Sequence, residues 1–105
     1  MEVVITQEGS GPMPTAGQKI KAHYNGMFPD GKKFDSSYDR GQPLEFVVGA
    51  GQVIRGWDEG FLKLKVGSKA RLTCPPEYAY GAAGAGGVIP PNATLIFDVE
   101  LVAIC

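Results

Sequence analysis

The feature that most constrains the fold is the recurrence of an apolar residue at every second position over residues 94–102. A period of two is typical of a β-strand that buries one face. Residues 19–24 and 69–74 show the same alternation. The side chains expected on the buried face are Leu95, Phe97, Val99 and Leu101, then Ile20, Ala22 and Tyr24, and finally Ala70, Leu72 and Cys74. The pattern predicts a sheet with one apolar face.

One segment has the spacing of a helix instead. Its apolar residues recur every three or four positions, which predicts a short amphipathic helix over residues 55–64. Asp58 and Glu59 near its start suit the positive end of the helix dipole, and Gly67 lies just beyond its end. The recurring apolar residues are Ile54, Trp57, Phe61 and Leu64.

The rest of the chain reads as short strands joined by turns. Residues 3–7 and 44–48 are expected to be strands, and Pro29-Asp30-Gly31 has the composition of a chain reversal. The chain holds 15 glycines and 8 prolines, which favours many turns over a helix bundle. We therefore expect an α+β fold, with an antiparallel β-sheet wrapped around one short central α-helix, and one domain over residues 1–105.

A long loop is expected between the last two strands. Residues 78–91 are rich in glycine, alanine and proline, and these fourteen residues show no regular pattern. A loop of this length in a small domain usually has a function. It carries Tyr78, Tyr80, Val88 and Ile89, whose apolar surfaces suggest that the loop lies over a binding site.

Composition narrows the classes of partner. The net charge is −1, which argues against nucleic acid because such binding needs a basic face. No segment approaches the roughly 20 apolar residues of a membrane span. The two cysteines make no disulfide framework, with Cys74 expected to be a buried thiol and Cys105 an exposed one. With no signal peptide visible, we expect a cytoplasmic monomer.

Three features that resemble catalytic or cofactor motifs fail on inspection. Residues 26–33 nearly match a phosphate-binding loop, but Lys33 stands where a hydroxyl would hold Mg²⁺. Gly49-Ala50-Gly51 lacks the third glycine of a dinucleotide fingerprint, because Ile54 stands there. His23 is the only histidine, which excludes the usual Ser/His/Asp and His-cluster arrangements. We expect neither a metal nor a cofactor.

Six motifs, in order along nearly the whole chain, resemble one known family. They are His23-Tyr24-Asn25-Gly26, residues 30–37 (Asp-Gly-Lys-Lys-Phe-Asp-Ser-Ser), Val53-Ile54-Arg55-Gly56-Trp57, Tyr78-Ala79-Tyr80-Gly81, residues 89–95 (Ile-Pro-Pro-Asn-Ala-Thr-Leu) and Phe97-Asp98-Val99-Glu100-Leu101. The chain is similar to the FKBP-type peptidyl-prolyl cis-trans isomerases, the immunophilins that bind tacrolimus and rapamycin. The resemblance implies the same sheet wrapped around a short helix, and isomerisation of Xaa-Pro bonds during protein folding.

The resemblance also implies roles for individual residues. Trp57 would form the floor on which a proline ring sits, and Tyr80 would donate a hydrogen bond to a carbonyl of the ligand. The backbone N–H of Ile54 would donate a second. The implied walls are Tyr24, Phe34, Phe46 and Phe97, with Val53 and Ile54 at the rim and Val88 and Ile89 as further ligand contacts.

Asp35 would lie at the pocket edge, tied to Tyr24 and Arg40. Two interpretations of this carboxylate stay open. It could act electrostatically on the substrate carbonyl, or it could orient Tyr24 and Arg40. The structural interpretation is favoured, because a paired carboxylate beside an aromatic ring needs its hydrogen bonds satisfied.

The chain departs from the family pattern at several positions. Leu44 replaces an aromatic residue of the human cytosolic member and would trim one wall, while Gln52 replaces an acidic residue near the rim. Ala85 and Gly86 take the place of a His-Pro pair at the loop tip, which leaves substrate preference and drug affinity open.

Three functions remain compatible with such a pocket. The first is isomerisation of proline-containing peptides and proteins, with macrolide immunosuppressants as further ligands. The second is a binding module that docks a regulatory protein partner, with catalysis incidental. The third, a folding helper for unfolded chains, is less favoured because no inserted chaperone domain is visible.

Overall fold

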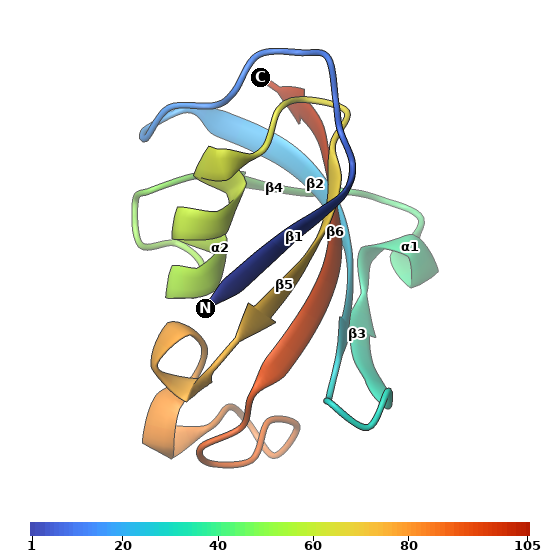
Figure 1. The fold of residues 1–105 in the computed structure, drawn as a ribbon. Coiled ribbons are helices and arrows are strands. Elements are labelled where there is room, and N and C mark those ends of the chain that lie inside the picture. Colours follow the sequence, from blue (N-terminus) through green and yellow to red (C-terminus); the bar gives the residue numbers. More distant parts are fainter.

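One curved antiparallel sheet organises the molecule (Figure 1). The computed structural model describes residues 1–105. Its strands follow the order β1-β5-β6-β2-β3, and β4 also pairs with β2. The strands are β1 (Glu2–Gln7), β2 (Lys19–Met27), β3 (Lys33–Ser36), β4 (Leu44–Val47), β5 (Lys69–Cys74) and β6 (Leu95–Ile104). The α+β class and the antiparallel sheet are confirmed.

Strand register brings three aromatic side chains of the predicted pocket together. In the pairing of β2 with β6, Tyr24 lies opposite Val99 and Gly26 opposite Phe97. A Cβ atom at Gly26 would approach the Phe34 ring to 2.8 Å and the Phe97 ring to 3.0 Å. Because glycine has no side chain, both rings can lie close over β2, beside Tyr24.

The central helix is shorter than the pattern predicts. Helix α2 (Arg55–Gly60) lies across the concave face of the sheet and continues as the 3₁₀ turn η1 (Phe61–Lys63) (Figure 1). The N–H of Phe61 still bonds to the carbonyl of Trp57, but the N–H of Leu64 bonds back only three residues, to Phe61. Apolar spacing of three or four cannot distinguish an α-helix from a helix that tightens at its end.

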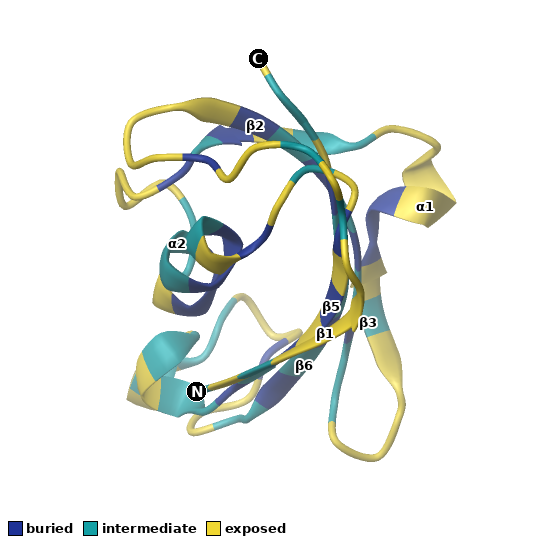
Figure 2. Cartoon of the chain, turned by 45° about the horizontal axis from the view of Figure 1, so that its top comes forward, coloured by how far each residue is buried: buried dark blue, intermediate teal, exposed yellow.

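The hydrophobic core fills the space between α2 and the sheet. Figure 2 shows the buried residues on the helix face that points to the strands and along the middle of the sheet. All the residues expected on the buried faces of β2, β5 and β6 lie there, so these patterns are confirmed. The core residues are Ile20, Ala22, Tyr24, Phe46, Val48, Trp57, Phe61, Leu64, Ala70, Leu72, Cys74, Ile89, Leu95, Phe97, Val99 and Leu101.

The segment between β5 and β6 is more ordered than expected. It contains the 3₁₀ turns η2 (Pro76–Tyr78) and η3 (Gly81–Ala83), and Ala85 and Ile89 form an isolated bridge. The expectation of fourteen residues without regular structure is therefore wrong. A four-residue helix, α1 (Ser37–Arg40), also escaped prediction, because one turn carries no periodic signal.

Both cysteines are free, Cys74 buried and Cys105 exposed, as expected. Burial raises the pKa of the Cys74 thiol to about 11. None of the helices combines the length and apolar character needed to cross a membrane.

Candidate active site

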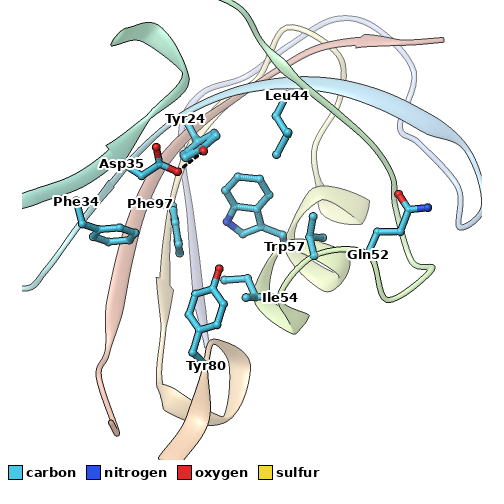
Figure 3. Close-up of a pocket in the computed structure, with 10 residues that line it drawn as sticks. Tyr24, Phe34, Asp35, Leu44, Gln52, Ile54, Trp57, Tyr80 and Phe97 are labelled. Atoms are coloured by element: carbon cyan, nitrogen blue, oxygen red, sulfur yellow. Dashed lines mark hydrogen bonds between the residues drawn. The ribbon is translucent and has the colours of Figure 1, made fainter. Parts of the chain in front are cut away.

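Trp57 forms the floor of a cavity at the concave face (Figure 3). Its indole is only 4% exposed and is surrounded by four aromatic rings. The Tyr24, Phe61 and Phe97 rings meet it edge to face, with centroids 4.7, 5.5 and 5.3 Å away. The indole nitrogen is buried without a hydrogen-bond partner, so ring packing alone orients the floor.

The wall opposite α2 comes from β2, β3 and β6. Phe34 and Phe97 meet edge to face at 5.8 Å, and Phe97 also meets the Tyr24 ring at 6.4 Å. Each ring is therefore held by at least one other ring, and the wall is built on paired strands. This is the kind of rigid support that a preorganised pocket needs.

The opposite rim is the loop between β4 and α2. The Asp58 carboxylate accepts hydrogen bonds from the N–H groups of Gly49 and Gly51, at 2.9 and 3.0 Å. The Gln52 side chain accepts a third from the N–H of Val47, at 2.9 Å. Asp58 lies in the first turn of α2 as expected, and its hydrogen bonds also fix the loop that presents the rim.

The cavity is small, and most of the residues that line it are apolar. The cavity measures about 170 Å³, which is below the ~300–1,000 Å³ of pockets for drug-sized ligands. A second cavity of about 320 Å³ shares Phe34, Asp35 and Tyr80 with it. A larger ligand would therefore extend from the first cavity into the second. The first cavity is lined by Tyr24, Phe34, Asp35, Leu44, Gln52, Val53, Ile54, Trp57, Tyr80 and Phe97.

Two hydrogen-bond donors stand at the mouth of this cavity. Figure 3 shows Tyr80 and Ile54 beside each other, with the Tyr80 hydroxyl directed into the cavity. The N–H of Ile54 donates to no group of the protein, although its carbonyl accepts from Trp57 and Asp58. Both donors can therefore bind an acceptor on a ligand that fills the apolar space.

A charged cluster closes the far end of the pocket. The Tyr24 hydroxyl donates to Asp35 at 2.5 Å, and the Arg40 guanidinium donates to both groups, at 2.9 and 2.7 Å. Burial acts to raise the pKa of the Asp35 carboxyl, but the hydrogen bonds from Tyr24 and from the Ser36 N–H, with the charge of Arg40, outweigh it and lower that pKa. Burial, followed by the bond to Asp35, raises the pKa of Tyr24.

Some of the expected site residues lie outside the cavity. Phe46 does not line it, because its ring packs behind the indole, against Trp57 and Phe61. Val88 and Ile89 line the adjoining cavity. Arg40 reaches the site only through Tyr24 and Asp35.

Two lining residues were expected only as departures from the family pattern. Leu44 forms part of the wall beside Trp57, and Gln52 lies on the rim (Figure 3). Leu44 is the first residue of β4 and Gln52 lies within the loop that follows this strand, so no periodic pattern could have marked either as a lining residue.

Comparison with known proteins matches this architecture to one family. The model of the FKBP-type peptidyl-prolyl cis-trans isomerases matches residues 11–102. The chain is 55% identical to FK506-binding protein 1 of Dictyostelium discoideum, over 97% of this chain and 95% of that protein. It is 54% identical to the peptidyl-prolyl cis-trans isomerase Fkbp12 of Drosophila melanogaster, over 99% and 97%.

The fold agrees with the same assignment. The crystal structure of AtFKBP13 superposes with a TM-score of 0.92 at 44% identity, covering 98% of this chain and 91% of that one. The expected antiparallel sheet around a short helix is thereby confirmed. With its aromatic cavity, this chain belongs to the FKBP-type peptidyl-prolyl cis-trans isomerases.

Proposed function

We propose that this isomerase seats the proline ring of its substrate on Trp57, between the rings of Tyr24, Phe34 and Phe97. The apolar lining and the small volume of the cavity support this assignment. Tyr80 and the N–H of Ile54 would bind substrate carbonyls, since neither has a partner within the protein.

The chemistry required is rotation about an amide bond. Resonance gives the peptide C–N bond a rotation barrier on the order of 20 kcal/mol. Uncatalysed Xaa-Pro exchange takes tens to hundreds of seconds. In the twisted state this resonance is lost, and the charge separation between oxygen and nitrogen falls. An apolar cavity therefore destabilises the planar amide more than the twisted one.

The pocket accelerates rotation by binding the twisted form better than either planar form. Exclusion of water by the aromatic walls contributes, because it removes the hydration that favours the more polar planar amide. Tyr80 and Ile54 orient the chain on either side of the bond. Asp35 and Arg40 hold the Tyr24 side chain in place in the wall of the pocket. No covalent bond between protein and substrate forms or breaks.

The same pocket is proposed to bind macrolides. Relatives of this chain are named for binding FK506. A macrolide would fill the small cavity with one ring and continue into the adjoining cavity beside Val88 and Ile89. Gln52 at the rim and Ala85 in the adjoining cavity are the residues that would change its affinity.

The wider setting is also a proposal. We propose a single FKBP-type domain that acts as a monomer on proline-containing peptides and proteins. Two free thiols, Cys74 and Cys105, support a reducing, cytoplasmic setting. Docking of a regulatory protein partner remains the alternative use of the same pocket, because Tyr80 and Val88 are exposed beside it.

The deciding measurement is the cis-to-trans relaxation rate of a Leu-Pro-Phe peptide, with and without rapamycin. We expect the protein to accelerate exchange and the drug to abolish that acceleration. Phe34→Ala should cut turnover, whereas a folded Cys74→Ser variant should retain it. Drug binding without acceleration would favour docking, and an equal loss in Cys74→Ser would contradict the pocket mechanism.

A further inference from the structure

The segment that carries Tyr80 has no strand to hold it. Figure 1 shows the chain leaving β5 below α2 and turning back into β6. The backbone hydrogen bonds of this segment stay within residues 75–92, for example from the N–H of Tyr78 to Pro75 and from that of Asn92 to Gly81. None of them reaches α2, which carries the other side of the pocket. The distance between the two is therefore set by packing and by side-chain contacts rather than by backbone hydrogen bonds.

One side chain spans this gap. The guanidinium of Arg55, the first residue of α2, lies 4.3 Å from the centre of the Tyr78 ring. A cation this close to an aromatic face is attracted by the ring. Glu59, one turn along the helix, forms an ion pair with the same guanidinium.

The backbone beneath this contact is also closely packed. A Cβ atom at Gly56 would lie 2.4 Å from the Cys74 sulfur and 3.2 Å from the Tyr78 carbonyl oxygen. Because glycine has no Cβ, the start of α2 can rest directly on the end of β5 and on η2. The close approach of the backbone at Gly56 therefore allows the Arg55 side chain to reach the Tyr78 ring.

We propose that Arg55 and Tyr78 form a clamp that positions Tyr80 for ligand binding. Arg55 directly follows Ile54, whose N–H is one donor at the cavity mouth, and Tyr78 lies two residues before Tyr80, which supplies the other. The clamp sets the separation of the two donors. Arg55 is a positioning residue in this scheme, and the proposal rests on the proposed roles of Tyr80 and Ile54.

The first test measures the order of the segment without any ligand. Arg55→Gln should raise the amide hydrogen-exchange rates of residues 78–84 while leaving those of β5 unchanged. Arg71→Gln is the matched control, because it removes the same charge and a similarly exposed ion pair, with Asp98, and neither of these two residues lines the cavity. Tyr78→Phe should keep the wild-type rates, since the ring remains, and Tyr78→Leu should reproduce the effect of Arg55→Gln.

The second test couples the clamp to Tyr80. An exposed cation–π contact corresponds to a factor of roughly two to five in an equilibrium constant. Rapamycin should therefore bind Arg55→Gln about threefold more weakly, and the KM for a peptide should rise similarly with kcat unchanged. In a Tyr80→Phe background, Arg55→Gln should add no further loss.

The outcomes separate this proposal from the proposed function. Unchanged exchange in Arg55→Gln, or an equal loss of affinity with and without the Tyr80 hydroxyl, would overturn the clamp. Faster exchange of residues 78–84 in Arg55→Gln, in a protein that binds no rapamycin and isomerises no peptide, would support the clamp as the element that orders this segment and would overturn the roles proposed for the pocket.

Discussion

The pocket has a buried floor, Trp57 with Phe97 beside it, and an exposed rim, the segment between β5 and β6, and these two regions are built in opposite ways. Trp57 and Phe97 are each 4% exposed and belong to α2 and β6, where several rings and paired strands hold them. Tyr80 and Val88 are 43% and 58% exposed and belong to a segment bonded mainly to itself. The floor therefore contributes to folding as well as to binding, whereas the rim can vary at little cost to stability.

The largest expected difference lies in stability. Trp57→Ala should lower the free energy of unfolding by about 3–5 kcal/mol, because it removes a large buried ring and leaves a cavity. Tyr80→Ala should change it by only about 0.5 kcal/mol, since this residue is 43% exposed and lies outside the hydrophobic core. Urea unfolding of both variants tests the contrast. Similar losses would mean that the rim is as much a part of the core as the floor.

The second prediction concerns a change that should weaken binding and leave stability unchanged. Tyr80→Phe should weaken rapamycin binding by about 1 kcal/mol, roughly fivefold, because it removes one hydrogen bond. Its urea midpoint should match the wild type. If the hydroxyl binds planar and twisted substrate equally, KM rises and kcat stays constant. Titration of Trp57 fluorescence with the drug measures the affinity, and an unchanged value would remove Tyr80 from the binding site.

The same contrast explains what could be predicted from the sequence. The bounds expected for β5 are correct and those for β6 nearly so, because alternation reports directly which face is buried, whereas β2 continues beyond residue 24 to Met27. The predicted end of α2 was wrong, and the turns η2 and η3 were not predicted. Such tight turns depend on local packing and are too short to leave a periodic pattern in the sequence.

The residues of the site also differ in how far the sequence predicted them. Patterning alone placed Tyr24 and Phe97 on the buried face, where they lie. The family resemblance was needed to propose the Tyr80 hydroxyl as a hydrogen-bond donor to a ligand, because Tyr80 lies in a segment without a regular pattern. Neither source showed that Phe46 would pack behind the indole, because this depends on the order of rings in three dimensions.

A third, smaller effect should depend on pH. The pKa of Asp35 lies below its ordinary 3.8 in the folded protein, so its hydrogen bonds stabilise the fold above that pH. This contribution is lost as the pH falls through the lowered pKa. Asp35→Asn should therefore be less stable than the wild type at pH 7, by about 1 kcal/mol or less since the pair with Arg40 is half exposed.

Urea unfolding of Asp35→Asn and wild type between pH 7 and pH 2 checks this prediction. The difference in unfolding free energy should narrow below pH 3.8 and should be smaller at pH 7 in an Arg40→Gln background. A difference that is constant with pH would show that the Asp35 charge has no role in holding the cluster, and only its shape matters.

The smallest expected effect concerns Cys74, which reports on whether the floor opens. Its sulfur lies under the start of α2, where Gly56 packs against it, so a reagent can reach it only if the helix lifts from the sheet. With a pKa of about 11, this thiol is ionised at pH 8 in roughly one molecule in a thousand.

Iodoacetamide should therefore modify only Cys105 in the native protein, without a change in kcat/KM, and both cysteines in guanidinium. Mass spectrometry that found Cys74 modified under native conditions would mean that the floor opens as readily as the rim, and the distinction between them would fail.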